Sequence, residues 1–306
     1  MHSSNNIFLV RPANFGYNPE TAKSNAFQNQ IIQESNVIVQ NAIQEFDKMA
    51  KILSDKGINV LVIEDSPNPI KPDAVFPNNW GSFHSNGVAV LYPMLAENRR
   101  EEKRKEILES IQEKFEIKEI IDLSKHEEKG VFLEGTGSII FDHDAKIAYA
   151  CLAPRTDKKL FIETSKMLGY KPIYFYSRDI NGKEIYHTNV MMNIGNGYAV
   201  ICLESITDET EKNQVIKSLK SSGKKIIDIS FDQMKSFCGN MIELEIQEEK
   251  NILAMSQSAY NSLTLSQKST LESYCELFPI KIDTIERIGG GSVRCMISEI
   301  FLPKKN

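Results

Sequence analysis

Apolar residues along the chain follow two patterns, one typical of helices and one typical of buried strands. Between residues 30 and 54 an apolar residue recurs every three or four positions, which predicts one buried helix face: Val39, Ile43, Phe46, Ala50 and Leu53. Short unbroken apolar runs flank this segment at residues 7–10 and 58–63. Such runs predict buried strands, so the N-terminal segment up to Ile63 is expected to form a strand, a helix and a strand.

A similar order of elements recurs along the rest of the chain. The recurring units start near positions 76, 132, 187, 239 and 292, so their spacing is nearly even. Each of the first four starts leads into one or two short strands, a helix and a further strand. The helices are expected near residues 97–114, 156–168, 207–221 and 257–276. A fixed period of this length is typical of repeat architectures.

The fifth unit has only one strand before the sequence ends. Its missing strand, helix and strand match residues 7–63, so the N-terminal segment is expected to complete the last unit and close a ring. Closure removes exposed sheet edges. The predicted fold is therefore α/β, a five-bladed pseudo-symmetric α/β propeller that forms a single domain over residues 1–306. An open α/β sheet would give a similar order of elements and is the alternative.

Composition and charge exclude several classes of protein. The net charge is -5, with no basic face obvious, which argues against a nucleic-acid partner. The five Cys lack CxxC spacing and the five His lack HxH or HExxH spacing, so neither a disulfide framework nor a metal or other cofactor is expected. No run of about 18 apolar residues and no signal peptide is present, so we expect no membrane span and a cytoplasmic location.

If the units are arranged radially, the polar residues at their starts converge near one axis. These residues are Asp73, Asn78, Asn79, Glu134, His187, Asn189, Asn240 and Cys295. A Cys, a His and a carboxylate at one point form a constellation for nucleophilic catalysis. The thiolate would attack, the imidazolium would protonate the leaving nitrogen and then activate water, and the carboxylate would orient the imidazole.

Each of these residues also has an ordinary interpretation when it is taken alone. Cys295 follows the glycines at 289–291, a flexible loop suited to delivering a nucleophile, but free Cys is also commonly buried in a strand. Glu134 resembles a turn carboxylate, and His187 resembles a hydrogen-bonded strand histidine. The other histidines in polar, loop-like contexts are expected at the surface: His84, His126 and His143.

Four motifs in this chain resemble the guanidine-modifying, or pentein, superfamily. They are Phe-Pro-Asn-Asn at 76–79, Glu-Gly-Thr-Gly at 134–137, His187-Thr-Asn, and the glycine-rich loop into Arg294-Cys295-Met296. The superfamily includes arginine deiminase, dimethylarginine dimethylaminohydrolase and the amidinotransferases. The chain looks most similar to the arginine-deiminase-related or amidinotransferase-like bacterial hydrolases. The resemblance covers the whole length and implies a five-bladed α/β propeller, which the repeat predicts independently.

The resemblance also implies roles for individual residues. Cys295 would be the nucleophile, His187 the general acid/base and Glu134 its partner. The expected substrate contacts are Asp73 on the guanidinium side, Arg99 and Arg155 on the substrate α-carboxylate, and Phe76, Asn78, Asn79 and Asn189. A bidentate Arg–carboxylate pair suits that task. Without the resemblance, both arginines would be interpreted as solvated.

The chain departs from the superfamily's pattern at two of these positions. The arginine enzymes carry Asp where Asn79 stands, and arginine deiminase carries another where Asn189 stands. Burying a guanidinium without its counter-charges is costly. Asn offers a carbonyl and an NH2 but no charge, so a neutral ureido group suits two Asn better. The favoured hypothesis is therefore a hydrolase that converts citrulline into ornithine, carbon dioxide and ammonia.

Other functions remain open at the level of sequence. They are an arginine deiminase or dimethylarginine hydrolase, an amidinotransferase that passes its amidino group to an amine, and a non-catalytic ligand-binding member of the fold. The expected ligand is a small amino acid, and whether the chain forms a homo-oligomer is not readable. Residues 14–29, rich in Asn, Ser and Gln, are a candidate lid over the pore.

Overall fold

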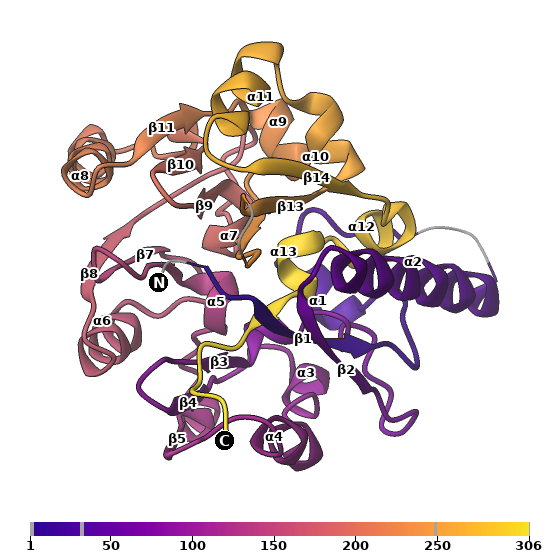
Figure 1. Ribbon diagram of the computed structural model, residues 1–306. Helices are drawn as coiled ribbons and strands as arrows, with labels where there is room; N and C mark the ends of the chain where they lie inside the picture. The colour runs from indigo at the N-terminus through magenta and orange to yellow at the C-terminus, as the bar shows by residue number, and fades with distance from the viewer. Residues whose placement is uncertain (1–2, 31–33, 248–249, 306) are drawn as a thin grey trace. The chain divides into compact units, whose positions relative to one another are not determined.

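The computed structural model of the protein describes residues 3–30, 34–247 and 250–305, and it contains five three-stranded sheets (Figure 1). All five have the same pairing. The first strand runs antiparallel to the second, and the second runs parallel to the third. This regular pairing confirms the predicted repeat and excludes the alternative of one open sheet.

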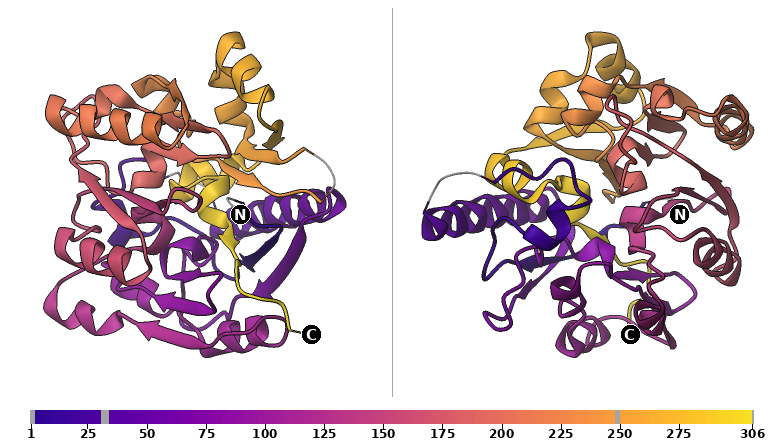
Figure 2. Two further views of the ribbon diagram at one scale, coloured as in Figure 1. Left: turned by 60° about the vertical axis from the view of Figure 1, so that its left-hand side comes forward. Right: turned by 180° about the vertical axis from the view of Figure 1, so that it is seen from behind.

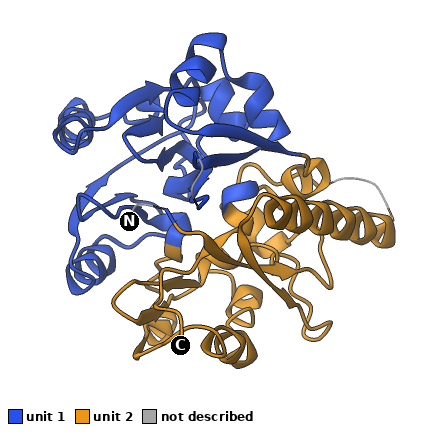
Figure 3. Ribbon diagram, in the orientation of Figure 1, with its two compact units in different colours: residues 1–3, 136–280, 292–294 blue, residues 4–135, 281–291, 295–306 orange. Residues whose placement is uncertain are grey.

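The chain divides into two compact units, coloured separately in Figure 3. Unit 1 contains residues 1–3, 136–280 and 292–294, and unit 2 contains residues 4–135, 281–291 and 295–306. A boundary falls within each of two single-turn helices, α5 (Gly135–Ser138) and α13 (Val293–Met296). The single domain that the sequence predicts stays a prediction.

Unit 2 holds two sheets, β3-β4-β5 and β15-β1-β2. Its strands are β1 (Asn6–Arg11), β2 (Asn59–Glu64), β3 (Gly81–Phe83), β4 (Val88–Leu91), β5 (Glu119–Asp122) and β15 (Ser298–Glu299). Its helices are α1 (Pro19–Ala22), α2 (Ser35–Asp55), α3 (Glu97–Arg100), α4 (Lys105–Gln112) and α12 (Asp283–Gly289), with the 3-10 turns η1 (Pro77–Asn79) and η2 (Ser124–Lys129).

The N-terminal segment completes the last sheet, as the repeat predicts. Strand β1 is its central strand, paired antiparallel with β15 through Phe8 and Ser298 and parallel with β2. In Figure 1 the yellow C-terminal segment runs beside the indigo β1. Helix α2 packs on β1 and β2 and lies beside α12, as Figure 2 also shows. The two ends of the sequence therefore share one sheet and one covering helix.

Helix α2 confirms the predicted helix but differs from it in detail. It begins at Ser35, and residues 31–33 of the predicted helix lie outside the described part of the chain. Its buried residues are Ile38, Ala42, Phe46, Met49 and Leu53. The predicted face shared only Phe46 and Leu53 with this set, because several neighbouring apolar residues allow two nearly equivalent stripes.

The prediction of one helix over residues 97–114 is wrong. The structure has α3 and α4, and the break falls at the residues between them. Glu102 turns its carboxylate inward to Arg99, and Arg104 takes an extended backbone before α4 begins. A buried ion pair at this turn outweighs the helix propensity of the charged residues around it.

The core of unit 2 packs aromatic rings from both of its sheets. Phe8 lies 5.8 Å from Trp80 and 5.5 Å from Phe83, measured between ring centroids. All three side chains are almost completely buried. Trp80 directly follows Asn79, so the core anchors the end of the Phe-Pro-Asn-Asn motif.

Unit 1 holds the other three sheets. Its strands are β6 (Ile140–Asp142), β7 (Ile147–Cys151), β8 (Lys171–Phe175), β9 (Met192–Ile194), β10 (Tyr198–Ile201), β11 (Lys225–Asp228), β12 (Ile242–Leu244), β13 (Ile252–Ser256) and β14 (Glu276–Ile280). Its helices are α6 (Lys158–Met167), α7 (Thr188–Met191), α8 (Glu209–Ser221), α9 (Phe231–Lys235), α10 (Gln257–Ser262) and α11 (Leu265–Glu272), with the 3-10 turn η3 (Leu203–Ser205).

Capping residues decide where the helices of unit 1 begin. Asp157 and Asp208 accept backbone N–H groups at the starts of α6 and α8. The single helix predicted over 257–276 is wrong, because Leu263 is extended and Thr264 starts α11 with a capping box.

None of the helices in the described ranges combines the length and the apolar character that crossing a bilayer requires. The cytoplasmic location stays a prediction.

Candidate active site

Four predicted motifs occupy the same place in four sheets. Each lies on or beside a single helical turn that directly precedes the first strand: η1 before β3, α5 before β6, α7 before β9 and α13 before β15. Asn79 ends η1, Glu134 precedes α5, His187 is the N-cap of α7, and Cys295 lies within α13. The repeat therefore puts chemically different residues at equivalent positions.

In unit 2, Phe76 and Cys295 border the same glycine loop. A Cβ atom on Gly289 or Gly291 would lie 2.8 or 2.9 Å from the Phe76 ring, closer than any side chain tolerates. A Cβ on Gly291 would also lie 3.3 Å from the Cβ of Cys295. The glycines are thus needed because the aromatic ring of the first motif packs directly on the loop that leads to the thiol.

The turn after Glu134 packs on the same motif. Gly135 has a φ of 48°, and a Cβ there would lie 2.5 Å from the carbonyl oxygen of Asn78 and 2.7 Å from that of Asn79. Glu134 is fully buried, and its Oε1 accepts a hydrogen bond of 3.0 Å from the backbone N–H of Leu95. Three predicted motifs, around Asn79, Glu134 and Cys295, therefore meet within unit 2.

Arg99 ties this region together with four hydrogen bonds. Its Nε and Nη2 donate to the two carboxylate oxygens of Glu102, both at 2.8 Å. Nη1 donates to Oδ1 of Asn79 at 2.7 Å, and Nη2 also donates to the carbonyl of Phe76 at 3.0 Å. Arg99 was predicted to hold a substrate carboxylate, but these bonds use four of its five N–H groups.

The charges in this cluster shift each other's pKa. Burial raises the pKa of the Glu102 carboxyl to about 7; Arg99 opposes the rise, and the charges of Asp73 and Glu134 add to it. For Arg99, burial lowers the pKa, but the attraction of Glu102 outweighs burial and the net shift is upward. Arg99 therefore stays a cation, surrounded by three buried carboxylates.

Asp73 contacts the segment that was predicted as a lid. Its Oδ2 accepts hydrogen bonds from Asn18 at 2.8 Å and from Thr21 at 2.9 Å. Asn25 and Gln28 donate to backbone carbonyls of the glycine loop. Residues 18–28 thus lie between Asp73 and the loop that precedes Cys295, and their role as a lid stays a prediction.

In unit 1, the other predicted residues also lie together. The guanidinium of Arg155 lies 4.9 Å from the centroid of the Tyr186 ring, which is itself 4.7 Å from the ring of His187. Asn240 donates to the backbone carbonyl of Asn189 at 3.0 Å. Arg155, His187 and Asn189 are all buried. The second half of the predicted site is thus a compact group on α7 and its neighbours.

The predicted catalytic trio comprises residues from both units, because His187 belongs to unit 1 while Glu134 and Cys295 belong to unit 2. Their meeting at one point stays a prediction.

The sequence did not indicate that Asn18 and Glu102 take part in the network around the predicted site. Asn18 before Pro19 is a readable helix cap, but nothing nearby signals its bond to Asp73. Glu102, three residues after Arg99, looks like an ordinary surface pair.

One histidine outside the predicted site does not lie where the sequence predicts it. The expectation that His84 lies at the surface is wrong, since it is buried and its Nε2 lies 2.7 Å from Oγ of Ser82.

All five cysteines are free and buried. Burial raises the pKa of three of them to about 12: Cys151, Cys202 and Cys275. Within the described ranges, no cluster of three or more potential metal ligands occurs.

Comparison with known protein families shows to which family the chain belongs. Residues 11–302 match the family model described as "N,N dimethylarginine dimethylhydrolase, eukaryotic". The chain belongs to this family. No curated protein sequence matches it. As a member of the family and of the guanidine-modifying superfamily, the chain is a hydrolase that acts on carbon–nitrogen bonds other than peptide bonds.

Several solved structures share the fold. The N-terminal domain of ArgZ, a cyanobacterial arginine dihydrolase, was solved bound to substrate; it is 15% identical with a TM-score of 0.74, and the match covers 97% of this chain and 99% of that domain. AgrE in complex with L-arginine is 15% identical with a TM-score of 0.75, over 98% of this chain and 41% of AgrE. The dimethylarginine hydrolase of Pseudomonas aeruginosa, a mutant complexed with citrulline, is 13% identical with a TM-score of 0.66, over 97% and 99%.

These similarities confirm the predicted fold class, the five-bladed α/β propeller. The chain spans only 39% of full-length ArgZ and 41% of AgrE. At these identities the likeness establishes the fold and does not establish the substrate.

Proposed function

We propose that this protein hydrolyses the ureido group of citrulline, or of a close relative, through a covalent bond to Cys295. The observation that supports this substrate is the orientation of the Asn79 amide. Arg99 has only donors, so the amide must turn its Oδ1 to Arg99. Its Nδ2 is buried and has no partner among the described residues. A buried NH2 group of this kind requires an acceptor.

A ureido group supplies that acceptor and a guanidinium does not. The ureido carbonyl oxygen accepts hydrogen bonds, whereas every polar atom of a guanidinium is a donor. A guanidinium facing Nδ2 of Asn79 would set donors against donors and would lack the counter-charge that Asp supplies in the arginine enzymes. Asn79 therefore favours a neutral substrate with a carbonyl oxygen.

The proposed reaction has two steps. The Cys295 thiolate attacks the ureido carbon, and the tetrahedral intermediate collapses with loss of ammonia, whose nitrogen His187 protonates. This leaves a thiocarbamate, in which the sulfur and the ornithine Nδ are bonded to one carbonyl. Water, activated by His187, then attacks that carbonyl and expels the thiolate. The released carbamate loses carbon dioxide and leaves ornithine.

In both steps negative charge develops on the oxygen that faces the Asn79 NH2. A donor held in place before the reaction stabilises such charge more than it stabilises the bound substrate. Glu134, fixed by the Leu95 N–H, would orient His187, and Arg155 would hold the substrate's α-carboxylate. These roles require the two units to meet at the site and are part of the proposal.

A second candidate is an arginine dihydrolase, which the likeness to ArgZ and AgrE favours. Attack of Cys295 on arginine with loss of one ammonia gives an amidino thioester. Water then attacks the same carbon and a second ammonia leaves, which gives the same thiocarbamate. Hydrolysis of this thiocarbamate is the last step of both reactions. The two candidates differ in the substrate that enters and in the number of ammonia molecules released.

Substrate assays with the wild-type protein and the Cys295→Ala variant distinguish these functions. The expected result is ornithine and one ammonia per citrulline, with no product from the variant. Ornithine with two ammonia per arginine, and no turnover of added citrulline, would support the dihydrolase. Arginine or dimethylarginine converted only to citrulline would contradict both. Glycine or lysine in the same assay would reveal an amidinotransferase by a transferred group.

A further inference from the structure

We infer that Arg99 and Glu102 are positioning residues that fix the direction of the Asn79 amide, and thereby the preference for a carbonyl oxygen over a guanidinium. This inference deepens the proposed function and rests on it for the identity of the preferred substrate. The expected role of Arg99 as a ligand of the substrate carboxylate stays a prediction, for which one N–H group of the guanidinium remains.

The contacts of Arg99 leave the Asn79 amide only one favourable direction. Two N–H groups of Arg99 go to Glu102 and one to the Phe76 carbonyl, so the guanidinium plane is fixed on three sides. Nη1 then faces Asn79 at 2.7 Å. If the amide flipped and exchanged its oxygen and nitrogen, Nδ2 would meet Nη1, and two donors would face each other without an acceptor.

Burial makes this preference strong. Asn79, Arg99 and Glu102 are 3%, 3% and 2% exposed, so bulk water is not available to satisfy a flipped amide. Glu102 supplies the paired carboxylate for the buried cation, and Asp73 and Glu134 add further negative charge around it. The backbone of the motif cannot move easily either, because Phe76 packs on the glycine loop and Trp80 lies in the core.

A single conservative substitution can remove the carboxylate of Glu102 from this group of hydrogen-bonded side chains. A Gln at this position keeps the size of the side chain but offers one acceptor in place of two. Arg99 would lose one of its charge-assisted bonds, and the guanidinium plane would no longer be held on that side. The Asn79 amide could then flip and turn its oxygen toward the substrate.

The test is a double-mutant cycle between Glu102→Gln and Asn79→Ala, with kcat and KM measured for citrulline and for arginine. We expect Glu102→Gln to lower kcat for citrulline about tenfold, with a KM change below about threefold, and to lower the citrulline-to-arginine ratio of kcat/KM. In the Asn79→Ala background the same substitution should change kcat by less than about twofold. A full Glu102 effect in that background, or an equal loss for both substrates, would overturn the inference.

Three further variants separate positioning from general destabilisation. Asp142→Asn breaks another buried ion pair, with Lys224 at 3.4 Å, and is expected to leave the substrate ratio unchanged. Arg99→Lys keeps a cationic donor for Asn79 but not the bidentate pair with Glu102, so it should retain more of the ratio than Arg99→Met, which keeps no donor. Equal ratios for the Lys and Met variants would contradict a role that acts through Asn79.

The coupling between Glu102 and Asn79 can still be measured if the proposed substrate is wrong. If the protein turns over arginine and not citrulline, the proposed function fails, but the cycle is completed on arginine. If neither is turned over, the cycle is repeated on the dissociation constants of both amino acids in the Cys295→Ala background. Coupling below about twofold in that measurement would overturn the positioning role.

Discussion

At the residue scale, the proposed function depends on the two ends of the Asn79 side-chain amide. The amide oxygen accepts a hydrogen bond from Arg99, whereas the NH2 group has no partner among the described residues. This NH2 group can donate a hydrogen bond, whereas an Asp at the same position could only accept one when ionised. The proposed substrate preference therefore depends on the direction of one amide.

Asn79→Asp is expected to reverse that preference. The new carboxylate would pair with Arg99 and still present an oxygen to a guanidinium, while it would repel a ureido oxygen. We expect kcat/KM for citrulline to fall at least about tenfold and turnover of arginine to rise. Side-by-side assays of both substrates measure this. An unchanged ratio of the two would show that residue 79 does not select the substrate.

Glu102 is expected to make stability depend on pH. Its pKa is about 7 in the folded protein, above the ordinary value of 4.5, so the folded state binds the extra proton between these pH values. The stabilisation from that proton is complete below about pH 4.5 and is lost as the pH rises through about 7. Comparing urea unfolding of wild type and Glu102→Gln isolates this effect from all other titrating groups.

The wild type should lose up to about 3 kcal/mol relative to the Glu102→Gln variant between pH 5 and pH 8. A difference that stays constant over this range would contradict the raised pKa. A difference that grows in favour of the wild type as the pH rises would mean that Arg99 holds the pKa of Glu102 below its ordinary value.

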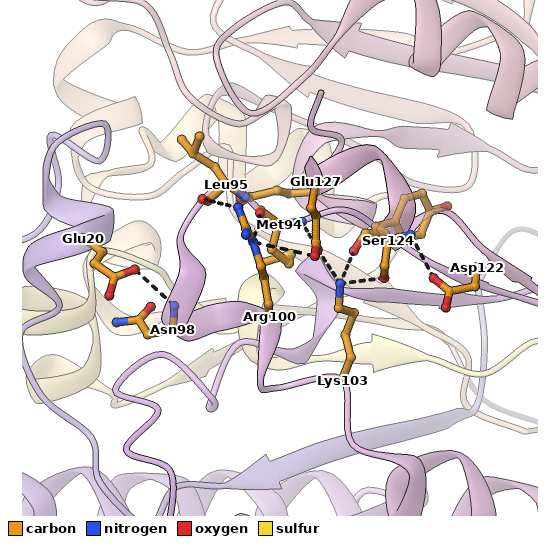
Figure 4. Close-up of polar contacts among 11 residues, drawn as sticks. Glu20, Met94, Leu95, Asn98, Arg100, Lys103, Asp122, Ser124 and Glu127 are labelled. Carbon is orange, nitrogen blue, oxygen red and sulfur yellow. Dashed lines mark hydrogen bonds and ion pairs between the residues drawn. The ribbon is translucent and has the colours of Figure 1, made fainter. Parts of the chain in front are cut away.

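At the scale of elements, a polar network orders the loop that orients Glu134 (Figure 4). Arg100 on α3 donates to the carbonyls of Met94 and Leu95. Glu127 on η2 accepts from the Met94 N–H at 2.8 Å and pairs with Lys103. The loop is thereby held so that the Leu95 N–H meets Glu134. Glu20 accepts from the Asn98 N–H and binds α1 to the start of α3.

Glu127→Gln should weaken this network without touching the site directly. Losing the charge removes the ion pairs of Glu127 with Lys103 and Arg100, although both keep other hydrogen bonds, so the loop and the Leu95 N–H are less well ordered. We expect kcat to fall about three- to tenfold with little change in KM. Glu109→Gln, which removes an exposed ion pair with Lys105, is the matched control and should leave both constants unchanged. Equal kinetics for the two variants would contradict the role of the network.

The sequence predicts the strands and helices better than it predicts where a helix is interrupted. Apolar runs and the period locate all five sheets, because both depend on burial of one face. The helix breaks near Glu102 and Leu263 are not predictable in this way. The first depends on a buried ion pair, and the second on a capping residue inside a continuous helical pattern. Likewise, motifs identify Asn79 and Cys295, whereas Glu102 becomes visible only through its contacts.

At the scale of the whole molecule, the chain closes its repeat by placing its first strand in its last sheet. Strand β1 pairs with β15, and Phe8 on β1 packs against Trp80 and Phe83 from the neighbouring sheet of unit 2. The closure could be predicted, since the N-terminal segment up to Ile63 supplies the elements that the fifth unit lacks. The division into two compact units has no counterpart in the sequence, because the period is uniform across it.

Phe8→Ala is expected to destabilise the protein by about 3–5 kcal/mol, because it empties the centre of this aromatic cluster. Val37→Ala, at a side chain that is 40% exposed, is the control and should cost less than about 0.5 kcal/mol. Urea unfolding measures both. A decrease in the free energy of unfolding below about 1 kcal/mol for Phe8→Ala would show that this aromatic cluster is not a main source of stability.

Catalysis through a covalent intermediate at Cys295 underlies both candidate functions, and acid quenching of the reaction with citrulline tests it most directly. After digestion, mass spectrometry should find the peptide with Cys295 heavier by citrulline less ammonia, the mass of the thiocarbamate. An adduct on any of the other four cysteines, or ornithine formed with Cys295 replaced by Ala, would contradict this chemistry.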